Sequence, residues 1–151
     1  MTGNLLHFED FHAGQVFVLG PYEMTEAAII AFAREFDFQP FHLDKAAAEQ
    51  SVLGSLSASG WHTASAMTRM MCDAVYSHAE ILGSSGIEEM KWLKPVFPGD
   101  VLTGTMTITG TRRSASKPEM GVVTFDAFVQ DQHGTVKATT RSMAFFKVRA
   151  P

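Results

Sequence analysis

Residues 59–78 read SGWHTASAMTRMMCDAVYSH, and this stretch decides the fold. Its apolar side chains, among them Trp61, Met67 and Met71, are spread so evenly that a helix here would show little polar surface on any side. Helices that are apolar all round lie in the interior of a protein. The stretch therefore predicts one long buried helix with no exposed face.

The residues after this helix carry the pattern of β-strands. Val123 and Phe125 alternate with Thr124 and Asp126, which is the period of a sheet covered on one face. Strands are expected at residues 86–93, 101–113, 122–130 and 135–148, separated by turns at 98–100 and 131–134 and a polar loop at 114–119. A long helix followed by an antiparallel meander predicts an α+β fold.

The residues before the helix predict smaller elements. A strand is expected at residues 15–22, and a helix that begins after the N-cap Thr25 and runs to about Phe36. Pro40 cannot continue this helix, because its ring removes a backbone donor and restricts the residue before it. Residues 37–42 are therefore expected to form an irregular corner.

Composition limits the class of protein. The chain has 151 residues, 46% of them apolar and 19% charged, which suits one domain spanning residues 1–151. Its net charge is -4 and its 12 basic residues are spread thinly, so nucleic acid is not an expected partner. No apolar run approaches the roughly 18 residues of a membrane helix, and the first residues do not resemble a secretory leader.

The single cysteine and the surplus of apolar residues give two further expectations. Cys72 has no second cysteine with which to form an intramolecular disulfide, so the cytoplasm is the expected compartment. The apolar fraction is high for so little charge, and such a surplus often lies in a subunit interface. We therefore expect a homodimer or a higher homo-oligomer.

The first candidate site is FDFQPFHLD at residues 36–44. The proline prevents a helix, so the chain can fold back and bring Asp37 and His42 to one spot. An aspartate and a histidine suit general acid–base catalysis, and Phe36, Phe38 and Phe41 are expected to exclude water and so raise the pKa of the carboxyl group. The alternative is an aspartate that caps a turn and a histidine bonded to the backbone.

The second candidate is SASGWHTAS at residues 57–65, where the long helix begins. A glycine allows a ligand to approach the backbone, and the unpaired N–H groups of a helix start can stabilise a developing oxyanion. Gly60 is the candidate donor, while Ser59, Trp61, Trp92, Gln39 and Phe41 are candidate substrate-binding residues. The alternative is a serine N-cap followed by a glycine that packs closely.

Other features indicate structural roles. His62 is expected to be a packed histidine rather than a base, and the methionines of the helix are expected to fill the core or to line an acyl-chain tunnel. The remaining histidines lack the spacing of metal ligands, so no metal site is expected. The chain has no phosphate-binding or dinucleotide-binding glycine motif, so no nucleotide cofactor is expected.

Taken in order, FDFQPFHLD, the glycine at the helix start and KWLKPVFPGDVL (residues 91–102) resemble the MaoC-like dehydratase and (R)-specific enoyl-CoA hydratase family. The resemblance implies a hotdog fold, in which a long central helix is wrapped by a curved antiparallel sheet of about five strands, usually in a dimer. It implies that Asp37 and His42 are the catalytic pair and that the Gly60 N–H faces the thioester carbonyl. Gln39 stands where the family usually has asparagine, and Ser59 where its hydratases often have histidine.

The resemblance implies a lyase of fatty acid metabolism. The expected reaction is reversible hydration of a trans-2-enoyl thioester of coenzyme A or acyl carrier protein, which is equally the dehydration of a 3-hydroxyacyl thioester. One of Asp37 and His42 would remove a proton from water, and the other would protonate C2. No cofactor is expected besides the coenzyme A of the substrate. Two alternatives stay open: a hotdog thioesterase, and a non-catalytic subunit that binds acyl thioesters.

Overall fold

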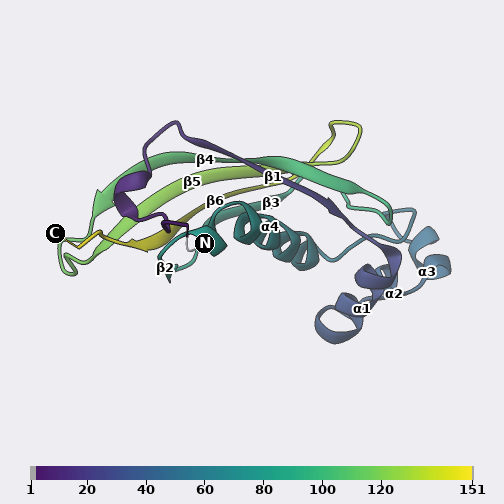
Figure 1. Ribbon diagram of the computed structural model, residues 1–151. Coiled ribbons are helices and arrows are strands. Elements are labelled where there is room, and N and C mark those ends of the chain that lie inside the picture. The colour runs from purple at the N-terminus through teal and green to yellow at the C-terminus, as the bar shows by residue number, and fades with distance from the viewer. Residues whose placement is uncertain (1–2, 151) are drawn as a thin grey trace.

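A curved antiparallel sheet wraps around one long helix in the computed structural model, which describes residues 3–150 (Figure 1). The helix is α4 (Gly60–Ala74), and it lies against the concave face of the sheet. The strands are β1 (Val16–Glu23), β2 (Ile81–Gly83), β3 (Ile87–Trp92), β4 (Val101–Arg113), β5 (Met120–Gln130) and β6 (Val136–Lys147). This arrangement confirms the predicted α+β hotdog fold.

The sheet has six strands instead of about five, because residues 81–92 form two short strands. The strand order is β1-β4-β5-β6-β2, and β3 also pairs with β6. Gly83 and Gly86 separate β2 from β3, with φ angles of 134° and 142° that side-chain-bearing residues rarely adopt. The chain bends at these glycines, so β2 and β3 both pair with β6. The alternation of apolar and polar residues does not predict this break.

The concave face of the sheet forms the core with α4. Val123, Phe125, Ala127 and Val129 of β5 are all buried, as their alternation predicts. They share one hydrophobic cluster with residues of the helix, including Met67, Met70 and Met71. The methionines are therefore core residues, as expected.

The prediction that the long helix has no exposed face is wrong. One side of α4 is open to solvent and carries Trp61, Ser65, Thr68, Arg69 and Asp73. The hydroxyl groups of Ser65 and Thr68 donate to helix carbonyl groups at 2.8 and 3.1 Å, so they need no partner from another element. The helix also ends earlier than expected, and residues 76–78 form the 3-10 turn η2 (Tyr76–His78).

Three short helices lie beyond one end of the sheet: α1 (Glu26–Phe36), α2 (Pro40–Leu43) and α3 (Lys45–Glu49) (Figure 1). Thr25 caps α1 as predicted, because its hydroxyl accepts the Ala28 N–H at 3.2 Å. The irregular corner expected at residues 37–42 is partly wrong, since Pro40 begins a helix of its own. Proline is favoured at the first position of a helix, where its missing N–H has no partner to lose.

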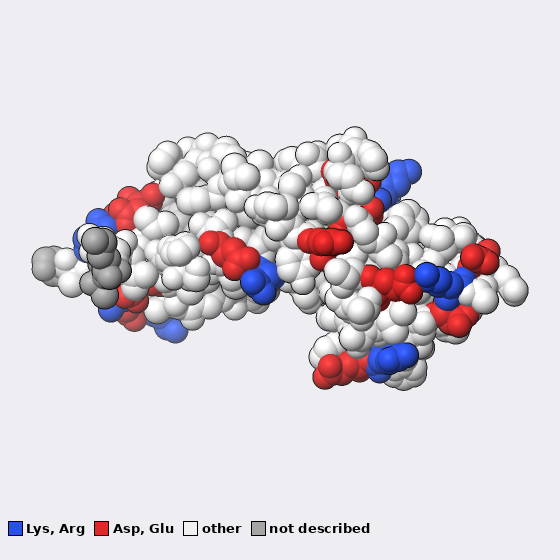
Figure 2. Space-filling view, turned by 45° about the vertical axis from the view of Figure 1, so that its right-hand side comes forward, with Lys and Arg blue, Asp and Glu red and all other residues white. Residues whose placement is uncertain are grey.

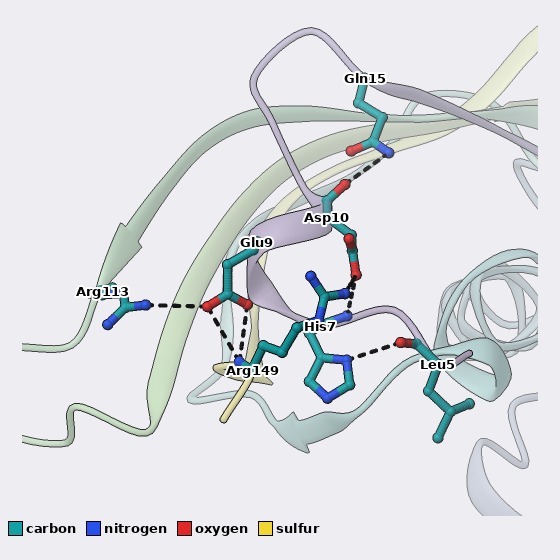
Figure 3. A network of polar contacts seen from close by, with 7 residues as sticks. All are labelled: Leu5, His7, Glu9, Asp10, Gln15, Arg113 and Arg149. Atoms are coloured by element: carbon teal, nitrogen blue, oxygen red, sulfur yellow. Dashed lines mark hydrogen bonds and ion pairs between the residues drawn. The ribbon is translucent and has the colours of Figure 1, made fainter. Parts of the chain in front are cut away.

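Ion pairs at the other end of the sheet join segments that are distant in sequence (Figure 3). The carboxylate of Glu9, in the 3-10 turn η1 (Phe8–Asp10), accepts the Arg149 N–H at 3.0 Å and pairs with Arg113 at 3.2 Å. Asp10 accepts the His7 N–H at 2.8 Å and pairs with the Arg149 side chain at 2.6 Å. The network ties the first turn of the fold to the segment that follows β6.

Basic and acidic side chains are interspersed on the face shown in Figure 2, and no basic stripe crosses the part of it that the structure describes. Within residues 3–150, none of the helices has the length and apolar character needed to cross a membrane.

Candidate active site

The structure brings Asp37 and His42 together. Asp37 follows the last residue of α1, and His42 lies on α2, two residues after Pro40. The imidazole Nε2 is 3.5 Å from the carboxylate Oδ2, and His42 is 6% exposed. The break at the proline therefore produces the juxtaposition that the sequence predicts.

The other nitrogen of His42 fixes the orientation of the ring. Nδ1 lies 2.6 Å from the Ser57 carbonyl oxygen. A carbonyl can only accept, so Nδ1 carries a proton, and Nε2 is the ring nitrogen that faces Asp37. The histidine is thus both bonded to the backbone and paired with the aspartate, which combines the two alternatives considered for it.

The carboxylate of Asp37 has two further partners. The Gln39 side chain donates to Oδ1 at 2.7 Å, and the Ser59 hydroxyl also bonds to the carboxylate. Burial pushes the pKa of Asp37 upward, but the hydrogen bonds from Ser59 and Gln39 and the neighbouring His42 together outweigh it, so the pKa lies below its ordinary value. The expected rise in this pKa is therefore wrong, and Asp37 is ionised at neutral pH.

Gly60 is the first residue of α4, after the N-cap Ser59. The first N–H groups of a helix have no acceptor within it, and no bond from the Gly60 N–H to another residue of the described chain is found. A Cβ at this position would lie 2.6 Å from the Trp92 ring, and the Trp92 indole donates to the Gly60 carbonyl at 2.8 Å. Close packing against Trp92 therefore requires glycine here, while the role as oxyanion donor stays a prediction.

The aromatic residues are only partly placed as expected. Phe41 contacts the His42 ring edge-on, with centroids 4.6 Å apart. Phe36 and Phe38 are 65% and 76% exposed, so the expectation that they exclude water from Asp37 is wrong for the single chain. Trp61 and Trp92 are half-exposed and stack edge-to-face, with centroids 5.1 Å apart.

An apolar cavity of about 320 Å³ begins beside the helix start. It lies between the open side of α4 and the inner face of the sheet, and its lining includes Trp61, Ala64, Met67, Met71, Met90 and Phe125. Asp37 and His42 are not among the lining residues, but Trp61 directly follows Gly60 in the chain. The cavity thus starts one residue from the candidate oxyanion donor.

His62 is placed in the structure by packing rather than by a role in the site. His62 is buried and stacks on Phe32 with centroids 4.7 Å apart, which confirms that it is a packed histidine. Burial lowers its pKa, so the ring stays neutral. Within residues 3–150, no three His, Cys, Asp or Glu side chains are grouped so that they could hold a metal ion.

A family model described as MaoC like domain matches residues 10–129, which include the Asp37–His42 pair and the start of α4. The chain belongs to this family. Among curated proteins, the chain is 25% identical to the uncharacterised protein YdeM of Bacillus subtilis over 79% of this chain and 83% of that relative. It is 29% identical to Protein MaoC of Klebsiella aerogenes over 67% of this chain, but spans only 30% of that protein's length.

Solved structures show the same fold over nearly the whole chain. A MaoC-like dehydratase from Rhodospirillum rubrum is 37% identical, with a TM-score of 0.88 over 97% of this chain and 99% of that chain. A monoamine oxidase regulatory protein from Archaeoglobus is 26% identical, with a TM-score of 0.90 over 99% of each chain. An (R)-hydratase from A. caviae, at 24% identity and a TM-score of 0.70 over 90% of this chain and 97% of that chain, shares the fold.

Proposed function

We propose that this protein catalyses the reversible hydration of a trans-2-enoyl thioester, with Asp37 and His42 as the reacting pair and Gly60 as the oxyanion donor. The observation that carries the proposal is the arrangement of His42, whose Nδ1 is fixed by Ser57 while Nε2 faces an ionised carboxylate 3.5 Å away. The similarity to a MaoC-like dehydratase at 37% identity supports the same class of reaction.

The protonation states suggest how the pair divides the work. Asp37 is ionised and cannot supply a proton, but together with Nε2 of His42 it can hold one water by accepting from it. In our mechanism, Nε2 takes a proton as the water oxygen attacks C3, and the imidazolium that forms is stabilised by Asp37. The same proton then passes to C2. Water adds across the double bond, and the enzyme ends in its starting state.

The helix start would stabilise the charge that develops during this step. Attack at C3 moves negative charge to the thioester oxygen, and the unpaired Gly60 N–H at the positive end of α4 would donate to it. The acyl chain would then extend past Trp61 into the cavity beside α4, whose lining is mostly apolar. Both coenzyme A and acyl carrier protein present such a thioester, and we propose cytoplasmic action on one of these carriers.

We also propose that the chain works as a homodimer or higher homo-oligomer. Ile87 and Trp92 of β3, the following Leu93 and Trp61 of α4 are large apolar residues that are 45–58% exposed. A second copy on this side would remove them from water and protect the unpaired edge of β3. Light scattering at micromolar concentration tests this proposal, because a monomer would contradict it.

The hydratase proposal is tested with the purified protein and enoyl-CoA substrates of several chain lengths, by following the loss of enoyl absorbance. Asp37→Asn should lower the rate by about 10²- to 10⁴-fold. Asp126→Asn is the matched control, because Asp126 is exposed on β5 and, within residues 3–150, pairs only with Arg141. Equal rates for wild type and Asp37→Asn on every substrate would refute the proposal.

The same assay separates the alternatives. A thioesterase would release free thiol, whereas a hydratase consumes the enoyl group without releasing thiol. Saturable binding of acyl-CoA without turnover would instead identify a non-catalytic binding subunit.

A further inference from the structure

Lys137 is a buried lysine on β6, 5% exposed, that lies outside the candidate active site. Its ammonium group is 3.2 Å from the Asp100 carboxylate and 3.4 Å from the Asp131 carboxylate, and it donates to the Pro95 carbonyl at 2.8 Å. It also lies 5.1 Å from the centre of the Phe97 ring. The ammonium group thus has one hydrogen bond to a backbone carbonyl and two ion pairs, all to groups that the fold holds in place.

Two of these acceptors belong to one turn, at residues 95–100. Within the turn, Asp100 accepts the Phe97 N–H at 2.9 Å, and its own N–H donates to the Phe97 carbonyl at 3.0 Å. Lys137 therefore holds both ends of the PVFPGD segment, through Pro95 and Asp100. The resemblance to the family depends partly on this segment, but none of its residues takes part in the proposed reaction.

The turn is bonded directly to the segment that builds the active site. The Ala58 N–H donates to the Val96 carbonyl at 2.8 Å. On one side of Ala58, the Ser57 carbonyl holds the His42 ring, and on the other side Ser59 bonds to the catalytic carboxylate and caps α4. Val96 is the residue next to Pro95. The path from the Lys137 ammonium to the His42 ring therefore consists of three hydrogen bonds, at the carbonyl groups of Pro95, Val96 and Ser57, joined by single steps along the backbone.

The backbone of Lys137 holds the segment that follows β3. Its carbonyl accepts the N–H groups of Leu93 at 2.8 Å and Lys94 at 3.2 Å. These residues directly follow Trp92, the residue that packs over Gly60. One residue thus anchors both segments that meet at the helix start.

We infer that Lys137 is a positioning residue, which fixes the Ser57–Gly60 segment through the 95–100 turn and so sets the positions of the His42 ring and the Gly60 N–H. This inference rests on the proposed function. Buried ion pairs are often no more stabilising than apolar residues of the same shape, so stability is a weak reason for burying three charges here. The position that the one hydrogen bond and the two ion pairs give to the 95–100 turn provides the better reason.

The test compares Lys137→Met with Val123→Ala, a buried substitution in β5 that touches none of these contacts, in the full-length protein. The Nδ1 proton of His42 is observed by NMR and assigned by its absence in His42→Gln. We expect Lys137→Met to shift or broaden this signal and to lower kcat by about 10- to 100-fold with little change in KM. Val123→Ala should leave the signal in place even if the stability falls equally.

An unchanged Nδ1 signal in Lys137→Met would overturn the inference. If Lys137→Met does not fold, Asp131→Asn keeps the ammonium group and removes one of its contacts, and the signal must then move in that variant for the inference to stand. The NMR measurement needs no substrate. A wild-type protein without hydratase activity would therefore refute the proposed function. The NMR signal would still test whether Lys137 sets the position of the His42 ring.

Discussion

Gly60→Ala separates the catalytic importance of the helix start from its importance for stability. The new methyl group would lie 2.6–2.8 Å from three atoms of the Trp92 ring, so the ring must move. Moving it breaks the indole bond to the Gly60 carbonyl, worth about 1 kcal/mol, and disturbs the contact with Trp61, worth about another 1 kcal/mol. Alanine regains up to about 1 kcal/mol of helix propensity, so the net loss of unfolding free energy is about 1 kcal/mol.

The expected loss of activity is larger than this loss of stability. A displaced oxyanion donor lowers the rate by about 10²- to 10³-fold, whereas 1 kcal/mol lowers Tm by only about 2–4 °C. The assay is a double-mutant cycle that measures Tm and kcat for Gly60→Ala in the wild-type background and in Trp92→Ala, where the ring is absent. Gly60→Ala should lower Tm and kcat much less in the Trp92→Ala background than in the wild-type background. Equal effects in both backgrounds, or full activity in Gly60→Ala, would refute the argument.

Three further predictions concern other parts of the molecule. Gln39→Leu removes a hydrogen bond that lowers the pKa of Asp37, so the acidic limb of the pH–rate profile should move to higher pH; an unmoved limb would contradict this. Arg149→Ala removes the side chain that pairs with Asp10, a carboxylate whose pKa is lowered in the folded state, but keeps the backbone N–H that Glu9 accepts. The loss of stability, at most about 1 kcal/mol at pH 7, should shrink as the pH falls through the ordinary carboxyl range, as denaturant titrations would show. Ala64→Leu places a larger side chain in the cavity wall, so kcat/KM for long enoyl thioesters should fall more than kcat/KM for short ones. Enoyl absorbance assays measure both values, and the same ratio of the two in variant and wild type would contradict the prediction.

The sequence predicts those parts of the site that depend on local chain chemistry. Pro40 interrupts the helix between Asp37 and His42, and only four residues separate the two, so their approach could be expected from local backbone geometry. Thr25 and the alternation along β5 are local in the same sense. The pKa direction of Asp37 was not predictable, because it depends on Ser59, which lies far along the chain and meets Asp37 only in the folded protein.

Other features leave no local signal at all. The partner of His42 is the backbone carbonyl of Ser57, and a carbonyl group is present whatever the side chain is. On the open side of α4, Ser65 and Thr68 bond to carbonyl groups of their own helix, and the apolar residues of this stretch do not indicate that side. Lys137 appears in the sequence as an ordinary strand lysine, and its two carboxylate partners come from separate turns.

The methionines in the wall of the cavity affect how sharply the protein could discriminate among ligands. Met67, Met71 and Met90 each have three rotatable side-chain bonds before the terminal methyl group, so the wall can repack around guests of different length. Immobilising such a side chain costs up to about 2 kcal/mol of conformational entropy, and a guest that leaves some of this freedom intact loses little affinity. A wall of this kind should give a gradual decline in affinity across neighbouring chain lengths, where a wall of branched residues would impose an abrupt cutoff.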